Sequence, residues 1–272
     1  MTAPLAGRLR HDWTAHDLAG MTWPEAARRL GAERGAVALL PVGAIEAHGP
    51  HLPLDADVII ARATAGHAAD RLAARRQVPV VLPPIAYGVS RVGTCFAGTT
   101  PVGPELVTGL VATVLAEVAR QGVRTFAVVN AHLEPAHVAA VEAGIAAFLA
   151  GDVEGCVVAF PDQRQARWAA MLSEEFRRGA RHAGGYETSL LLAAAPETVR
   201  ETLLAGLPPV WVDLPARLRE GASTFAEAGG VDGYFGDPAV ATAAEGAWLF
   251  GRLAEMVVLC LDEATTGGRD GE

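Results

Sequence analysis

Short apolar runs alternate with helix-length amphipathic segments along most of the chain. The apolar runs are typical of buried strands at 36–42, 78–85, 125–130 and 156–162. Segments with helical spacing lie between or beyond them, at 23–34, 58–76, 104–120, 135–151, 164–180 and 239–256, and residues 181–199 pass from a glycine-rich loop into a further helix. Strands that alternate with helices favour a parallel sheet, because each parallel connection needs a crossover. The pattern therefore predicts an α/β fold with helices on both faces of the sheet.

Two loops interrupt this regular pattern. The first, GAIEAHGPHLPLDAD at 43–57, is rich in glycine and proline and follows the strand 36–42. The second, YGVSRVGTCFAGTTPV at 87–102, has no helical or strand-like spacing. Irregular loops of this length inside a compact domain are commonly functional, so the second loop is expected to contribute to a site.

Composition narrows the class of protein. The chain has 272 residues, of which 51% are hydrophobic and 19% charged, and no segment resembles a linker, so we predict one domain over 1–272 with its core at about 36–256. A net charge of −9 argues against a nucleic-acid partner, which would need a basic face. All 22 basic residues are arginine, and this excludes enzymes that depend on a Walker lysine or a Schiff-base lysine.

Cysteine usage and hydropathy point to a cytoplasmic protein. Cys95, Cys156 and Cys260 are odd in number and far apart, which is typical of reduced thiols and not of a disulfide framework. The segment MTAPLAGRLRHDW at 1–13 lacks the apolar core of a signal peptide. No run of about 20 apolar residues is free of charges or breakers, so no membrane partner is expected.

Two acidic-histidine clusters follow two of the predicted strands. Glu46, His48 and Asp57 come after the strand 36–42, and His132 and Glu134 come after the strand 125–130. The carboxyl ends of parallel strands meet at one edge of a sheet, where such folds keep their ligands. Carboxylates and imidazoles gathered there can hold Zn²⁺, Mn²⁺ or Fe²⁺, and five candidate ligands suit a two-metal site.

One economical arrangement makes Asp57 a bridge between two ions. Glu46, Asp57 and His132 would bind the first ion, and His48, Asp57 and Glu134 the second. The structural alternative is that Asp57 caps the helix 58–76. Each cluster alone would more often be an ordinary loop, and it is their equivalent placement after two strands that favours metal binding.

A third segment, RHAGGYETS at 181–189, supplies candidate catalytic groups. His182 could pass a proton to a leaving amine, and Glu187 could share that role, complete a metal site or cap the following helix. His137 could be a spare ligand, a substrate contact or a surface residue, and His51 a support for a ligand or a packed loop residue. Ser90 lies in no nucleophile-elbow motif, which argues against a serine hydrolase.

The chain resembles the creatininase (creatinine amidohydrolase) superfamily. The likeness rests on PVGAIEAHGPHLPLDAD at 41–57, FAGTT at 96–100, VVNAHLEPAH at 128–137, HAGGYETS at 182–189 and GYFGDPAVATAAEG at 233–246. The resemblance implies a three-layer α/β/α domain with a mostly parallel sheet, a dinuclear centre of Zn²⁺ or Mn²⁺ with Fe²⁺ as an alternative, and a homo-oligomer such as a hexamer. It implies metal ligands at Glu46, His48, Asp57 and His132, and Glu134 corresponds to the acidic ligand of true creatininases. The sequence leaves open whether Glu134 or Glu187 completes the second site.

The resemblance also implies hydrolysis of a small-molecule amide. The expected reaction is cleavage of a non-peptide or cyclic amide C–N bond by a metal-activated hydroxide. Several positions depart from the usual family pattern, namely Val92, Gly93 and Ala97 in the second loop and Ala131, Leu133, Glu134 and Pro135 after the third strand. These departures leave open a deformylase or peptide-trimming role in cofactor biosynthesis. A further alternative is a metal-binding assembly subunit without catalysis.

Overall fold

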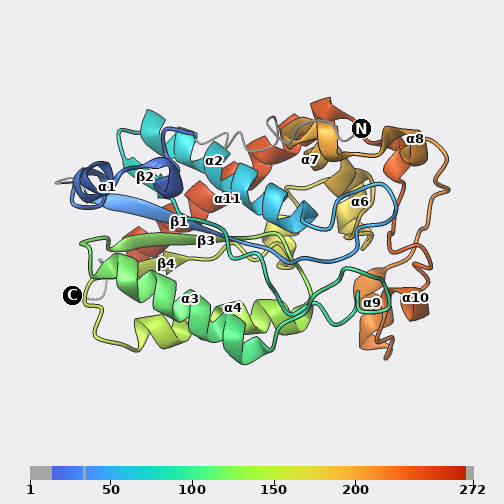
Figure 1. Ribbon diagram of the computed structural model, residues 1–272, viewed down its shortest axis with the longest axis horizontal. Coiled ribbons are helices and arrows are strands. Elements are labelled where there is room, and N and C mark those ends of the chain that lie inside the picture. Colours follow the sequence, from blue (N-terminus) through green and yellow to red (C-terminus); the bar gives the residue numbers. More distant parts are fainter. Residues whose placement is uncertain (1–13, 33–34, 268–272) are drawn as a thin grey trace, which may run out of the picture.

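Four parallel strands form the centre of the protein in the computed structural model, which describes residues 14–32 and 35–267. The strands are β1 (Ala36–Val42), β2 (Val78–Val81), β3 (Thr125–Asn130) and β4 (Val157–Ala159). Their order in the sheet is β2-β1-β3-β4, and every adjacent pair is parallel (Figure 1). The predicted α/β class with a parallel sheet is therefore confirmed.

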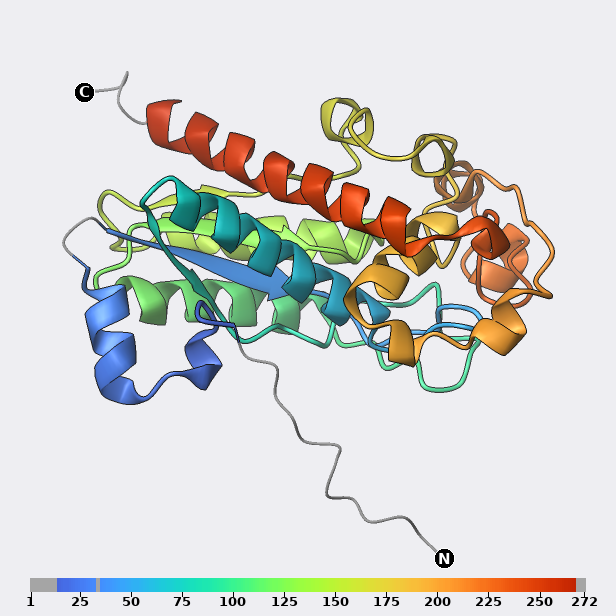
Figure 2. The ribbon, with the colours of Figure 1, turned by 90° about the horizontal axis from the view of Figure 1, so that it is seen from above.

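Long helices cover both faces of this sheet. On one face, α3 (Pro104–Ala119) packs against α4 (Pro135–Leu149). On the other face, α2 (Ala56–Ala74) packs against α11 (Ala243–Gly267), and Figure 2 shows α11 running alongside the sheet. The helices and the sheet thus make the three layers expected of an α/β/α fold.

The sequence of β1 explains how one strand packs against the helices on both faces of the sheet. Ala38 and Leu40 belong to the apolar cluster with α3 and α4, whereas Val37 and Leu39 belong to the cluster with α2 and α11. Successive side chains of a strand point to opposite faces, so a strand that is covered on both sides must be apolar throughout. Each buried leucine of this kind contributes roughly 1.5–3 kcal/mol to folding.

Several predicted boundaries are shifted in the structure. The strands 36–42 and 125–130 agree with β1 and β3. The strand predicted at 78–85 ends at Val81, because two prolines follow at 83 and 84 and cannot donate ladder hydrogen bonds. The final helix begins later and runs further than the predicted 239–256. Part of the helix predicted at 23–34 is α1 (Trp23–Leu30), and residues 33–34, like the segment 1–13, lie outside the described residues.

Two predictions about helices were wrong. Asp57 does not cap α2: it lies in the first turn, and Asp55 holds the position before the helix. The single helix predicted at 164–180 is instead two short helices, α5 (Ala166–Ala169) and α6 (Glu174–Arg177). The side chain of Ser173 accepts a hydrogen bond from the Phe176 N–H, and such a cap starts a new helix where a continuous one was expected.

Short helices and loops gather beyond the carboxyl ends of the strands. They are α5 and α6, α7 (Gly185–Ala194), α8 (Glu201–Leu204), α9 (Leu214–Arg219) and α10 (Phe225–Ala228). Cys95, Cys156 and Cys260 are free thiols, as predicted. In the part of the chain that the structure describes, no helix has the length and apolar character needed to cross a membrane.

Candidate metal centre

Six ionisable side chains from four separate segments converge at the carboxyl end of the sheet. They are Glu46 and His48 from the loop after β1, Asp57 from the first turn of α2, His132 from the loop after β3, and His182 and Glu187 from the segment that enters α7. All six are buried. Their ligand atoms form three groups that could each hold a metal ion.

The first group joins Glu46, Asp57 and His132. The Nδ1 atom of His132 lies 3.1 Å from Glu46 Oε1 and 3.1 Å from Asp57 Oδ2. These residues meet because β1 and β3 are adjacent and parallel, so the loops beyond them start at the same level. This is the set that the sequence assigned to one ion.

The second group joins His48, Asp57 and Glu187. The Nε2 atom of His48 lies 3.3 Å from Asp57 Oδ1 and 3.6 Å from Glu187 Oε2. Asp57 therefore belongs to both groups, with one oxygen turned to each, which is the arrangement expected of a bridging carboxylate.

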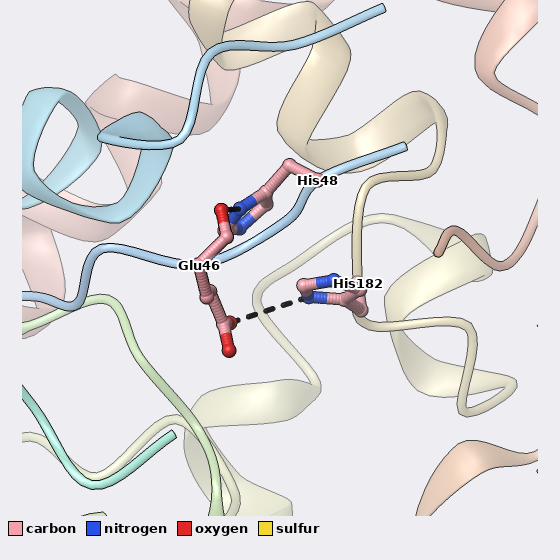
Figure 3. A group of neighbouring side chains, drawn as sticks. All are labelled: Glu46, His48 and His182. Carbon is pink, nitrogen blue, oxygen red and sulfur yellow. Dashed lines mark hydrogen bonds and ion pairs between the residues drawn. The ribbon is translucent and has the colours of Figure 1, made fainter. Parts of the chain in front are cut away.

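The third group joins Glu46 and His48 with His182, and Figure 3 shows its three side chains. The Nδ1 atom of His182 lies 3.6 Å from Glu46 Oε1, and the rings of His48 and His182 have centroids 4.4 Å apart. Figure 3 also shows that His182 approaches from a loop opposite the one that carries Glu46 and His48.

Backbone carbonyls fix the orientation of all three histidines. The pairs are His48 Nδ1 with Glu46 O at 3.1 Å, His132 Nε2 with Val89 O at 2.8 Å, and His182 Nε2 with Ala47 O at 2.8 Å. A carbonyl can only accept, so each of these outer nitrogens must carry the hydrogen. When the imidazoles are neutral, their inner nitrogens carry no hydrogen and face carboxylates. Metal-binding histidines are commonly oriented in this way by a carbonyl on the other nitrogen.

The buried carboxylates of this cluster need positive charge beside them. Burial alone would raise the pKa of Glu46, but the neighbouring His132 and His182 lower it to about 2. Burial would likewise lower the pKa of His48, yet Asp57, Glu187 and Glu46 together raise it to about 10. Without a metal ion, protonated histidines must therefore neutralise the buried carboxylates.

Two inward-facing atoms lack a hydrogen bond. His48 Nε2 and Asp57 Oδ2 are buried and have no hydrogen-bond partner among the described residues, although both lie at ion-pair distance from a neighbour. Orphaned polar atoms of this kind are uncommon in folded proteins and indicate an ion or water that completes them. Imidazole nitrogens and carboxylate oxygens are the donors that Zn²⁺ and Mn²⁺ accept, so the residues fit divalent metal ions.

Two contacts hold the carboxylates in place. Ser90 donates a hydrogen bond to Glu46 Oε2, and the Ala183 N–H donates one to Glu187 Oε2 at 2.6 Å. Burial raises the pKa of Glu187 to about 7 despite the neighbouring charge of His48. The Ser90 contact could not be predicted from local sequence, because Ser90 and Glu46 are 44 residues apart.

Glu134 lies apart from the three groups. Its carboxylate accepts the Val92 N–H at 3.1 Å, and none of the groups formed by the described residues includes it. Burial raises its pKa. Of the two residues proposed to complete the second site, the structure thus brings Glu187 next to His48 and turns Glu134 towards the loop 87–102.

His137 and Asn130 support the turn that carries His132. His137 accepts the Val89 N–H at Nδ1 and donates from Nε2 to Asn130 Oδ1, at 3.2 and 3.1 Å, so neither nitrogen is free for a metal. Asn130 in turn donates to His132 O at 2.6 Å and accepts the His132 N–H. His51 is also engaged, with its Nε2 2.9 Å from Thr188 Oγ1.

Glu175 shapes the glycine-rich segment before α7. Its carboxylate accepts the N–H groups of Gly185, Tyr186 and Asp237 at 3.0, 2.5 and 2.7 Å. A Cβ on Gly184 would lie 2.3 Å from the Phe235 carbonyl oxygen, so only glycine fits there. Sequence reasoning missed Glu175, which holds the segment that carries His182 and Glu187.

A cavity of about 620 Å³ opens over the cluster. Its floor includes Glu46, Asp57, His132, His182 and Glu187. Its walls include the segment 131–135, the side chains of α9 and Phe225, whose ring stacks on His182 with centroids 4.1 Å apart. The candidate ligands therefore face a space large enough for a small organic substrate.

Comparisons with known proteins identify the family of the chain. The family model for creatininase, described as creatinine amidohydrolase, matches residues 19–261. The chain is 35% identical over 227 residues to the mycofactocin precursor peptide peptidase of Mycolicibacterium smegmatis, covering 82% of each chain. It is 31% identical to the creatinine amidohydrolase of Pseudomonas putida over 204 residues, covering 70% of this chain and 75% of the relative.

A solved structure supports the same assignment. The structure described as "Creatininase Mn" has 25% sequence identity and a TM-score of 0.68, covering 92% of this chain and 98% of its own. The matched family region includes every segment that contributes to the cluster. The chain belongs to the creatininase family.

Proposed function

We propose that this protein is an amidohydrolase with a two-metal centre. Glu46, Asp57 and His132 would hold one ion, and His48, Asp57 and Glu187 the other. The observation that carries the proposal is the set of three buried histidines. In each, a backbone carbonyl holds the outer nitrogen and the inner nitrogen faces a carboxylate. The sequence left open whether Glu187 or Glu134 completes the second site. We assign this role to Glu187, because of the two only Glu187 approaches His48.

The ions, when bound, would lower the pKa of a water molecule and polarise the carbonyl oxygen of the amide. His182 supplies the proton transfer in this proposal. Its Nε2–H is held by Ala47 O, its Nδ1 is turned into the cluster, and burial together with His48 lowers its pKa to about 4. A neutral imidazole with a free nitrogen can take a proton from the attacking water and deliver it to the leaving nitrogen.

We infer that the substrate is an amide within a peptide or a peptide-derived precursor. The M. smegmatis relative, a peptide peptidase, is more similar to this chain than the P. putida creatinine amidohydrolase is and is matched over more of its length. Positions that depart from the family pattern line the cavity, namely Val92, Ala131, Leu133, Glu134 and Pro135. A cavity of about 620 Å³ also exceeds the need of a single small ring.

A small cyclic amide is the second candidate, and it is favoured by the similarity to creatinine amidohydrolase. The experiment that separates the two is turnover of a panel of short peptides, formamides, lactams and creatinine by metal-loaded protein. Hydrolysis of peptides alone supports the first candidate, and hydrolysis of lactams or creatinine alone supports the second. Bound metal with no turnover across the panel would contradict both and favour a binding protein without catalysis.

A further inference from the structure

Three arginines on the cavity wall have no acidic partner. Arg177 ends α6, Arg181 precedes His182, and Arg219 ends α9; all three line the cavity. None of the three forms an ion pair with another described residue. Arg177 and Arg219 are exposed and stay hydrated, whereas Arg181 is half-buried, and a partly desolvated cation is stabilised by a ligand that supplies the opposite charge.

The carboxylates on the same walls are already engaged. Asp162 is bound by Arg164, Asp213 caps α9 by accepting the Ala216 N–H, and Glu134 accepts the Val92 N–H. Asp213 and Asp162 act on Arg181 only at longer range than an ion pair. The guanidinium of Arg181 therefore has no ion-paired carboxylate and can bind an anion that enters the cavity.

Arg181 is the best placed of the three. It is half-buried, its Nε donates to Phe176 O at 3.1 Å, and its guanidinium carbon lies 4.6 Å from the centroid of the Phe176 ring. These contacts fix the plane of the guanidinium and leave its two terminal nitrogens without a hydrogen bond to the described residues. A fixed guanidinium edge with two free nitrogens matches the geometry of a carboxylate.

We propose that Arg181 binds a carboxylate of the substrate, with Arg177 and Arg219 attracting it at the cavity rim. The inference rests on the proposed function and narrows it to amides that carry a carboxylate, such as the C-terminal end of a peptide. Phe225 and Leu214 lie on the neighbouring wall and suit an apolar side chain next to that carboxylate. Arg181 is thus a specificity-determining residue for the chain's own hydrolytic site.

The test measures binding, so it does not depend on turnover. Calorimetry on metal-loaded protein compares N-acetylphenylalanine with N-acetylphenylalaninamide, which differ only in the carboxylate. We expect the acid to bind about 10- to 100-fold more tightly, as a charge-assisted bidentate contact predicts. Arg181→Gln should remove most of this difference by weakening the acid and leaving the amide unchanged. Metal content, measured in parallel, should not change.

Arg178→Gln is the matched control, because Arg178 lies next to Arg177, does not line the cavity and contacts Trp211. It removes the same charge and should keep the preference for the acid. Equal binding of acid and amide by the unmodified protein, no measurable binding of the acid, or a preference for the acid that survives Arg181→Gln would overturn the proposal. The last result would mean that the ions hold the carboxylate.

Phenyl phosphate distinguishes a carboxylate from a phosphate. If it binds through Arg181 more tightly than the acid, a phosphorylated substrate replaces the carboxylate in this inference, and the carboxylate proposal is overturned. The proposed function fails in a different way. A preference for the acid that depends on Arg181, without hydrolysis of any amide, would support the carboxylate subsite and contradict the proposed hydrolytic function.

Discussion

Two hollows of nearly equal size lie at opposite ends of the protein. One, of about 620 Å³, opens over the carboxyl ends of the strands, and the other, of about 610 Å³, lies between the last turns of α3 and α4. The second is lined by small side chains such as Ala116 and Ala147, by Arg120 and Arg124, which have partners, and by the exposed Asp152 and Glu154. Arg124, for example, donates to Ala119 O at 2.7 Å.

The difference between the two hollows lies in their polar atoms and not in their volume. The cluster below the first contains buried atoms that are held in place and lack hydrogen-bond partners, namely His48 Nε2 and Asp57 Oδ2. Protein folding does not leave such groups uncompensated without a cost of about 1–3 kcal/mol each. Of the two hollows, only the first therefore has the buried unsatisfied polar atoms expected at a ligand site.

The largest expected effect comes from Asp57→Asn, which removes the carboxylate shared by both metal groups. Metal content should fall and turnover should drop on the order of 10³-fold, equivalent to about 4 kcal/mol of barrier. Plasma mass spectrometry and a steady-state assay measure these quantities. Asp152→Asn makes the same change beside the second hollow and should alter neither. Unchanged activity in Asp57→Asn would contradict the two-metal proposal.

Removal of metal should destabilise the protein. At an ion concentration about 1,000 times the dissociation constant, binding adds about 4 kcal/mol to the free energy of unfolding. A chelator should then lower the Tm by roughly 10 °C for a domain of this size, as read by scanning calorimetry. Asp57→Asn should be insensitive to the chelator. A shift of equal size in that variant would place the stabilising ion elsewhere.

A smaller effect is expected from Ser90→Ala, which frees Glu46 Oε2. Residues that hold a metal ligand typically contribute 10–100-fold to metal affinity. Competition with a chromogenic chelator measures that loss. Thr113→Ala, which removes a hydroxyl beside the second hollow, is the control and should leave affinity unchanged. If both variants bind metal like the unmodified protein, Ser90 does not position Glu46.

The smallest effect per step is the change in metal affinity over one pH unit. In the metal-free protein the pKa of His48 is raised to about 10, above its ordinary value of 6.5, so the protonated form stabilises the fold fully below pH 6.5. That contribution to stability is lost as the pH rises through 10. A bound metal ion takes the place of the proton on His48, so metal binding releases this proton. Metal affinity should therefore increase up to about tenfold per pH unit for each proton released between pH 6.5 and 10. Calorimetry in buffers of different ionisation enthalpy should detect proton release, and its absence would contradict this charge balance.

Much of the scaffold followed from local sequence. Strands β1 and β3 were predicted at their observed bounds because both are continuous apolar runs. Their parallel pairing then brings Glu46 and His132 together without further information. The helix break at Ser173 was missed because the surrounding residues keep helical spacing, and a single side-chain cap decides the outcome.

The choice between Glu134 and Glu187 could not be made from the sequence. The spacing of His132 and Glu134 puts both on one side only if the chain stays extended. Here α4 begins at Pro135, and the chain turns at Glu134 towards Val92. Glu187 comes from a segment more than 120 residues after Asp57, and its approach depends on the packing of α7 against α2. Contacts of that range leave no local pattern.

Metal content per chain tests the central claim most directly. Protein purified without chelator, and protein reconstituted with Zn²⁺, Mn²⁺ or Fe²⁺, would be analysed by plasma mass spectrometry beside Asp57→Asn. The account predicts about two ions per chain, one for each group that shares Asp57, with loss of metal in the variant. Protein that binds no metal after reconstitution, or as much in the variant as in the unmodified chain, would contradict it.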